Sequence, residues 1–223
     1  ATVTARDLLD RGARSIASEL REEPEVRARL QITLGEAYAG LGLAPQALEL
    51  AQSAWQDAAA SADPMLQARA LSSLASAEVQ RGLGAQAEGH LRQGLALTLP
   101  AEPAAELLRA DLELGLATLL ASATRLDEAE PWFAAGLARQ RQVLGAVDPG
   151  VVTPYSSYLH ARGRVQEAET LLVDALQRVR RERSEDDPLR AGLAAQLATN
   201  LMRQGRAEEA IVLQQEALEA KRK

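Results

Sequence analysis

The sequence predicts an all-α protein, a right-handed superhelical solenoid of antiparallel helix pairs with about 11 helices. Two observations support this prediction. Hydrophobic residues make up 47% of the 223-residue chain but aromatic residues only 3%, so the core is expected to consist mainly of Ala and Leu. Such a core suits close helix packing and disfavours a sheet, which prefers β-branched and aromatic side chains. In addition, one pattern of small, large and breaker residues recurs about every 40 residues.

The recurring pattern is easiest to follow in three columns of equivalent positions. A small residue follows each turn at Ala47, Ala87, Ala129, Ala168 and Ala210, in steps of 40, 42, 39 and 42 residues. A helix breaker precedes it at Gly42, Gly82, Thr124, Gly163 and Gly205. A large apolar residue comes before the breaker at Leu34, Leu74, Leu116, Tyr155 and Leu197. Because the columns keep one register, they predict five repeats of a helix–turn–helix unit.

The first unit shows the spacing in most detail. Leu34, Gly35 and Tyr38 stand as L-G-x-x-Y on one helical face. Small residues then recur on the next helix at Ala47, Ala51 and Ala54. This unit resembles the tetratricopeptide repeat. The run LGAVDP at residues 144–149 and the length of the repeats resemble the kinesin-light-chain type of that repeat.

These patterns predict a capping helix followed by one continuous solenoid domain. Residues 1–23 are expected to hold the N-terminal capping helix, because the apolar and small residues of 4–21 fall on one stripe. The five helix pairs are expected at 24–62, 63–101, 102–147, 148–186 and 187–223. A Pro opens each pair, and the acidic residue before it can cap the helix. The chain opens at Ala1 without Met, which we interpret as a piece of a longer protein.

The fourth pair departs from the pattern at Pro154, which lies inside its expected first helix. An interior Pro costs about 3 kcal/mol or more, because it lacks an N–H and its ring clashes with the preceding turn. Two explanations are open: a kinked helix, or a helix that starts late with Thr153 as its cap. We favour the late start, because Gly150 and the β-branched residues after it weaken a first turn at Pro149.

Composition argues against several classes of function. The net charge of −6 disfavours a nucleic-acid partner, and the absence of Cys rules out disulfides and thiolate chemistry. No apolar run approaches the roughly 20 residues of a membrane span, so we expect no membrane insertion by this chain. His90 and His160 lie in different helices of different units, so we interpret each as solvated or hydrogen-bonded. We therefore expect no enzyme, no metal and no cofactor.

The candidate site is a groove. The first helix of each pair packs one face on its second helix, and the opposite face is expected to line a concave surface. This surface is polar and hydrogen-bonding, and we expect it to bind a protein or an extended peptide. Its candidate residues are Arg29, Ile32, Glu36, Arg69, Ser72, Ser76, Gln80, Asp111, Thr118, Ser122, Ser157, His160, Thr199 and Arg203. The alternative interpretation is a solvated face without a ligand.

The lead-in sequence adds a second resemblance. Residues 4–35, TARDLLDRGARSIASELREEPEVRARLQITLG, resemble the segment that opens the tetratricopeptide region of bacterial serine/threonine protein kinases. The resemblance implies a regulatory or partner-recruiting part of a larger signalling protein, whose kinase domain would lie outside this chain. The compartment stays open: cytoplasmic by default, extracytoplasmic if the parent protein spans a membrane.

Two other functions stand beside peptide binding. The last helix has Ile211, Val212, Leu213 and Leu218 without a following repeat to cover them, which favours a homodimer through the C-terminal helix. The third hypothesis is a sensor whose groove closes on a small ligand or a signal peptide.

Overall fold

The computed structural model describes residues 4–184 and 187–222, with side chains described up to Leu218. Within these residues the chain forms eleven α-helices and no strand. No helix in this part of the chain combines the length with the apolar character that crossing a bilayer would require. The chain separates into two compact units, Ala1–Leu119 and Leu120–Lys223.

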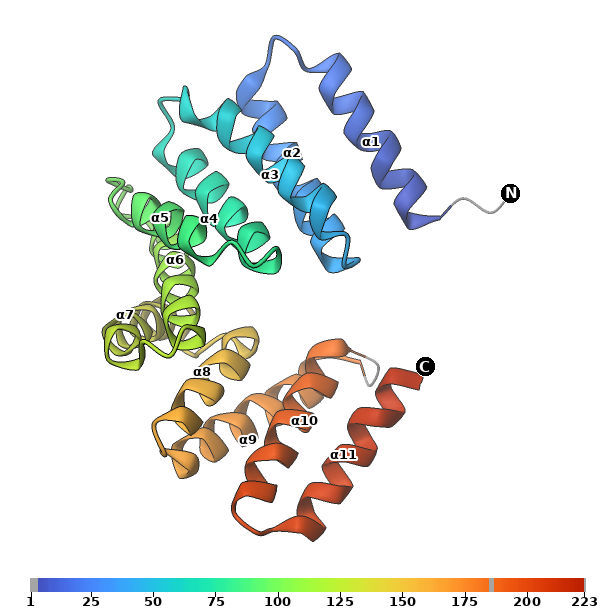
Figure 1. Ribbon diagram of the computed structural model, residues 1–223, viewed down its shortest axis with the longest axis vertical. Coiled ribbons are helices and arrows are strands. Elements are labelled where there is room, and N and C mark those ends of the chain that lie inside the picture. Colours follow the sequence, from blue (N-terminus) through green and yellow to red (C-terminus); the bar gives the residue numbers. More distant parts are fainter. Residues whose placement is uncertain (1–3, 185–186, 223) are drawn as a thin grey trace. The chain divides into compact units, whose positions relative to one another are not determined.

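The helices follow one another in pairs joined by short turns (Figure 1). The first unit contains α1 (Ala5–Glu19), α2 (Pro24–Gly40), α3 (Ala44–Ala59), α4 (Pro64–Gln80) and α5 (Gly84–Leu95). Helix α6 (Pro103–Ser122) crosses the boundary between the two units. The second unit continues with α7 (Leu126–Leu144), α8 (Pro149–Ala161), α9 (Val165–Glu182), α10 (Pro188–Arg203) and α11 (Ala207–Arg222). The prediction of an all-α protein built from helix pairs is confirmed.

Acidic residues before the prolines cap three of the helices. The Asp63 carboxylate accepts hydrogen bonds from the backbone N–H groups of Met65 and Leu66, at 2.9 and 3.2 Å. Asp148 and Asp187 cap α8 and α10 in the same way. The backbone N–H that Asp187 accepts holds the pKa of its carboxyl below the ordinary value. Each of these helices then begins with Pro, whose missing N–H costs nothing in a first turn.

The turns inside the pairs explain the breaker column. Gly42, Gly82, Gly163 and Gly205 all adopt left-handed backbone conformations, with φ between 72° and 77°. Thr124 occupies the same column and also adopts a positive φ, at 61°. This conformation lets the next N–H reach back to the end of the helix, as Leu43 N does to the Tyr38 carbonyl at 2.9 Å. Glycine favours it because it has no Cβ to clash.

Helix α1 packs on α2 with few buried side chains. None of its own residues is buried, so specific contacts fix its position. The Tyr38 hydroxyl donates a hydrogen bond of 2.6 Å to the Asp10 carboxylate. Burial of this phenol, together with that carboxylate, raises the pKa of Tyr38 to about 12. At the start of α1, Thr4 and Asp7 form a capping box in which each side chain accepts a hydrogen bond from the other residue's backbone N–H.

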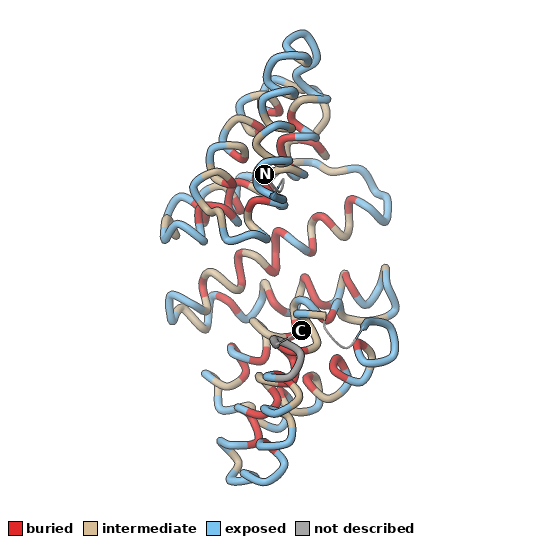
Figure 2. The backbone as a smooth tube through the Cα atoms, turned by 90° about the vertical axis from the view of Figure 1, so that its right-hand side faces the viewer, coloured by how far each residue is buried: buried red, intermediate tan, exposed pale blue. Residues whose placement is uncertain are grey.

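Small residues set the distance between the helices of a pair. The column residues Ala47, Ala51 and Ala54 are buried, and a Cβ added at Gly35 would lie 3.5 Å from the Ala47 carbonyl oxygen. The buried positions recur at intervals along the tube in Figure 2, as expected for helices that each bury one stripe. The helices therefore approach closely where the sequence places Ala or Gly.

Helix α8 corrects one prediction. It begins at Pro149 and contains Pro154, so the favoured late start with Thr153 as cap is wrong. The Asp148 carboxylate accepts a hydrogen bond of 2.7 Å from Gly150 N and supplies the start that the β-branched residues alone do not favour. The interior proline removes one backbone hydrogen bond, and the cap and the buried face of α8 offset this loss.

Two glycines of α5 test the small-residue packing. We expect Gly89→Ala to stabilise the protein by about 1 kcal/mol, because Ala is the better helix former and a Cβ there meets no atom within 4 Å. Gly94→Ala is expected to stabilise the protein less, or to destabilise it, because the added Cβ would lie 3.0 Å from Leu112 Cδ2. Urea unfolding followed by circular dichroism measures both variants. An equal gain in the free energy of unfolding for both variants would contradict tight packing at Gly94.

Candidate functional site

A groove of about 710 Å³ crosses α2, α4 and α6 in the first unit. Half of the predicted groove residues line it, namely Arg29, Ile32, Glu36, Arg69, Ser72, Ser76 and Asp111. Gln80 is exposed at the end of α4 and does not line it. The structure therefore brings together most of the residues predicted on the first two pairs and one residue of the third.

The groove has an apolar floor and a polar ridge. Ile32, Leu66 and Leu108 are buried and contribute to the floor from three different helices. The ridge follows one face of α4 at Arg69, Ser72, Ser73 and Ser76. A serine hydroxyl both donates and accepts hydrogen bonds. The ridge can therefore serve the N–H and C=O groups of an extended peptide backbone.

The two predicted cations of the groove differ in their surroundings. Arg29 Nη2 lies 2.6 Å from Asp63 Oδ2, so this guanidinium joins α2 to the residue that caps α4. Arg69 is exposed on the ridge and has no ion-pair partner among the described residues. Sequence reasoning treated the two residues alike, because the pairing of Arg29 depends on a residue in the next repeat. Arg69 is thus the cation that can bind an anionic group of a ligand.

Helix α6 contributes to the groove earlier in its length than predicted. Ala104, Leu107 and Leu108 line the groove together with Asp111, whereas Thr118 and Ser122 do not. Of the residues predicted on α6, Asp111 alone lines this groove, which follows the first half of the helix. The signal for this was the Glu102-Pro103 step, which starts α6 two turns before Asp111 and so gives the helix an extra apolar stretch.

The predicted residues of the second unit take part in local contacts. Ser157 and Thr199 are exposed, and their hydroxyls donate hydrogen bonds to the carbonyls of Thr153 and Ala195 on their own helices. Arg203 is exposed in the last turn of α10. These residues line neither the large groove nor a smaller hollow of about 320 Å³ at α9, α10 and α11.

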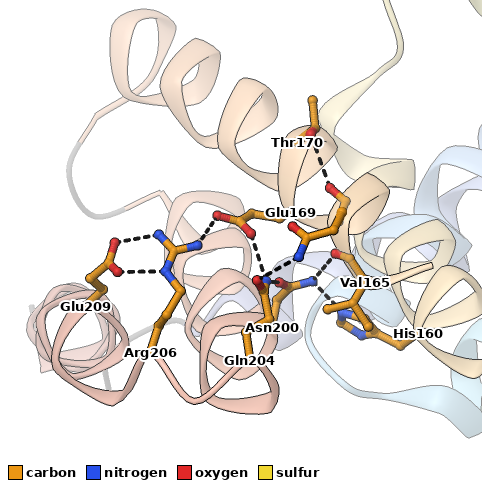
Figure 3. A network of polar contacts seen from close by, with 9 residues as sticks. His160, Val165, Glu169, Thr170, Asn200, Gln204, Arg206 and Glu209 are labelled. Carbon is orange, nitrogen blue, oxygen red and sulfur yellow. Dashed lines mark hydrogen bonds and ion pairs between the residues drawn. The ribbon is translucent and has the colours of Figure 1, made fainter. Parts of the chain in front are cut away.

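His160 belongs to a polar network that joins α8, α9, α10 and α11 (Figure 3). Its Nε2 lies 2.7 Å from the side-chain nitrogen of Asn200, which is fully buried. Because an amide nitrogen only donates, the ring nitrogen accepts, which requires a neutral imidazole. Asn200 also donates to the Val165 carbonyl and accepts from Gln204, at 3.0 and 2.6 Å.

The network continues to the surface through charged groups. Glu169 accepts hydrogen bonds from Gln204 at 2.7 Å and from Arg206 at 2.6 Å. The bond from Gln204 and then that from Arg206 hold the pKa of the Glu169 carboxyl below its ordinary value. Arg206 also pairs with Glu209 on α11. This network fixes the register of the last repeats and leaves His160 half-buried inside it.

The second histidine makes a separate contact. His90 Nδ1 lies 2.8 Å from the buried Glu78 carboxylate, which occupies the position that is aromatic in the first repeat. The described residues contain no group of three side chains suited to hold a metal ion. Each histidine is hydrogen-bonded, which is one of the two interpretations, solvated or hydrogen-bonded, that the sequence allowed.

Comparison with sequence models identifies the repeat. Residues 114–150 and 153–223 each match a model of the tetratricopeptide repeat. The chain therefore contains tetratricopeptide repeats over residues 114–150 and 153–223. The helix pairs of the first unit have the same turn conformation and the same column of buried alanines. A search of curated proteins finds no match in sequence.

Solved structures match along most of the chain. BtubC (BKLC) from P. vanneervenii has a TM-score of 0.70 at 17% identity, over 96% of this chain and 88% of that one. A putative kinesin light chain with nearly identical TPR-like repeats from Podosopora anserina has a TM-score of 0.61 at 21% identity, over 90% and 97%. YrrB, a TPR protein with an unusual peptide-binding site, has a TM-score of 0.51 at 15% identity, over 93% of each chain. At these identities the likeness shows the fold alone.

The polar network makes stability depend on pH. Burial, and then the charge of Arg203, lower the pKa of His160 below its ordinary value of 6.5. The folded state therefore binds this proton more weakly than the unfolded state, and stability is lost as pH falls through 6.5 and below. We expect the melting temperature to fall less between pH 7.5 and 5.5 in His160→Gln, which does not titrate, than in the wild type. Identical slopes for the two proteins would show that His160 does not contribute.

Proposed function

We propose that this chain is a non-catalytic scaffold that binds a protein or an extended peptide, and that the groove across α2, α4 and α6 holds the partner. The observation that supports this most directly is the ridge of α4, where an unpaired guanidinium and three serine hydroxyls stand above an apolar floor. Tetratricopeptide repeats generally act without catalysis, and the models of that repeat match this chain.

The groove suits an extended chain because its polar groups lie in a row. Ser72, Ser73 and Ser76 can hydrogen-bond a peptide backbone while the apolar floor takes small or aliphatic side chains. Arg69 favours an acidic side chain in the bound segment, since hydrogen bonds between charged groups are the stronger ones. Glu36 is also exposed in the lining and favours a basic residue elsewhere in the same peptide.

Ion pairs beside the groove support a preformed shape. Arg27 makes two hydrogen bonds of 2.7 and 2.5 Å to the Asp57 carboxylate and thereby links α2 to α3. Arg29 links α2 to the start of α4 through Asp63. A site that is already shaped loses less conformational entropy when a ligand binds. We therefore expect a peptide to bind without a large rearrangement of the first unit.

Two similarities to other proteins bear on what this chain binds and on the larger protein in which it acts. YrrB, which has a related fold, is a TPR protein with a peptide-binding site. The resemblance of residues 4–35 to bacterial serine/threonine kinases supports a partner-recruiting role within a larger signalling protein. The third hypothesis from the sequence, a small-ligand or signal-peptide sensor, stays a prediction; ligand-induced compaction in solution scattering would favour it.

Charge reversal on the ridge tests the groove. Peptides that the chain selects from a displayed random library are expected to carry an acidic residue. Arg69→Glu is expected to weaken the binding of these peptides about 10- to 100-fold. This range corresponds to the roughly 1.5–3 kcal/mol of a hydrogen bond to a charged group. Titration calorimetry with the selected peptides measures the effect.

Arg81→Glu is the matched control. Arg81 is exposed just beyond the end of α4 and does not line the groove, so the same change of charge there is expected to leave peptide affinity unaltered. Circular dichroism verifies that both variants keep their helices. If the selected peptides bind Arg69→Glu as well as they bind the wild type, the groove is not the binding surface.

A further inference from the structure

The polar network of the second unit determines which of its atoms donate hydrogen bonds. Glu169 is a carboxylate that only accepts, so the side-chain nitrogen of Gln204 donates to it at 2.7 Å. The same nitrogen lies 2.6 Å from Asn200 Oδ1, which therefore accepts. Asn200 Nδ2 is left to face two acceptors, the Val165 carbonyl at 3.0 Å and His160 Nε2 at 2.7 Å. Every donor direction up to the imidazole is thus fixed.

This arrangement selects one tautomer of His160. Nε2 accepts from Asn200, so the neutral ring carries its proton on Nδ1. Figure 3 shows His160 at one end of the network, with the Arg206–Glu209 pair at the other. Nδ1 is not buried, and none of the described residues makes a hydrogen bond with it. The network therefore presents an oriented N–H donor to the solvent.

Arg203 lies beside this donor. It stands three residues after Asn200 on α10, so the two residues lie on neighbouring turns of one side of the helix. Burial, and then the charge of Arg203, lower the pKa of His160, so the guanidinium is near enough to act on the ring. Arg203 is exposed and has no ion-pair partner within the described part of the chain. One turn before the two residues, Ser157 and Thr199 are uncharged, so neither competes for the cation.

The two groups together are suited to a carboxylate. One carboxylate oxygen can accept from the imidazole N–H while the other accepts from the guanidinium. The pair offers a single positive charge, which one carboxylate neutralises. A phosphate monoester carries about −1.5 to −2 charges at pH 7 and would leave an excess of negative charge on a chain whose net charge is already −6. The charge balance therefore favours an acidic side chain over a phosphate group.

We propose that His160 Nδ1 and the Arg203 guanidinium form a binding site for the carboxylate of an acidic side chain in a protein partner. Asn200 is a positioning residue, because it holds the imidazole in the donating tautomer from its buried place in the network. The site lies in the second unit and shares no residue with the groove across α2, α4 and α6. It therefore stands independently of the peptide binding proposed for that groove.

Nitrogen NMR of the wild-type chain tests the donor. The chain has only two histidines, which simplifies the assignment of both rings. At pH 7.5 His160 is expected to show a protonated Nδ1 and an unprotonated Nε2. The opposite tautomer, or an even mixture of the two, overturns the proposal before any variant is made.

Acetate is the probe for the site and is titrated at constant ionic strength. The His160 signals are expected to shift with half-saturation on the order of 10 mM, since a small ligand held by two contacts binds in the millimolar range. His90 is the internal control, because the Glu78 carboxylate already lies 2.8 Å from its Nδ1. An unchanged His160, or an equal shift of both rings, contradicts the site. Inorganic phosphate is expected to shift His160 less, and a stronger response to phosphate overturns the assignment to a carboxylate.

Variants test the cation. Arg203→Gln is expected to weaken the acetate response about tenfold, as the loss of a hydrogen bond between charged groups does. Arg181→Gln is the matched control, because Arg181 is exposed in the last turn of α9 and lies about 24 Å along that helix from its start. A response that Arg203→Gln leaves intact, or that both variants weaken equally, refutes the role of Arg203. Arg69→Glu in the groove is expected to leave the His160 response unchanged, so the two proposals are tested separately.

Discussion

The close approach of helices through small side chains is the constraint on which both units depend. With 3% aromatic residues the chain has few large side chains to fill gaps, so its helices must come near enough for Ala and Leu to pack. Gly35 approaches the Ala47 carbonyl, and Gly94 approaches Leu112, because a larger residue would hold these helices apart. The groove follows from this spacing, since it is lined by the first helices of successive repeats.

A core of Ala and Leu does not by itself fix how one repeat packs on the next. Polar contacts between repeats fix this register. Arg29 reaches from α2 to the cap of α4, and Glu169 reaches from α9 to Gln204 and Arg206. Partly exposed ion pairs contribute little to stability, so their main effect here is to favour one register over its neighbours. Arg69 has no ion-pair partner among the described residues, and this makes its charge informative.

Much of the fold could be predicted from the sequence because it depends on local rules. The prolines mark helix starts, and the breaker column marks turns that need a left-handed residue, even at Thr124. The site was less predictable because it depends on distant residues. Nothing near Arg29 in the sequence indicates Asp63 as its partner, and nothing near His160 indicates Asn200. The predicted start of α8 was wrong for a related reason. Helix propensity disfavoured a start at Pro149, but the Asp148 cap and the packing of the helix outweighed propensity.

The chemistry of the groove indicates the kind of ligand that it suits. The groove combines an apolar floor with hydroxyls and one unpaired cation, which suits a ligand that differs from the chain itself.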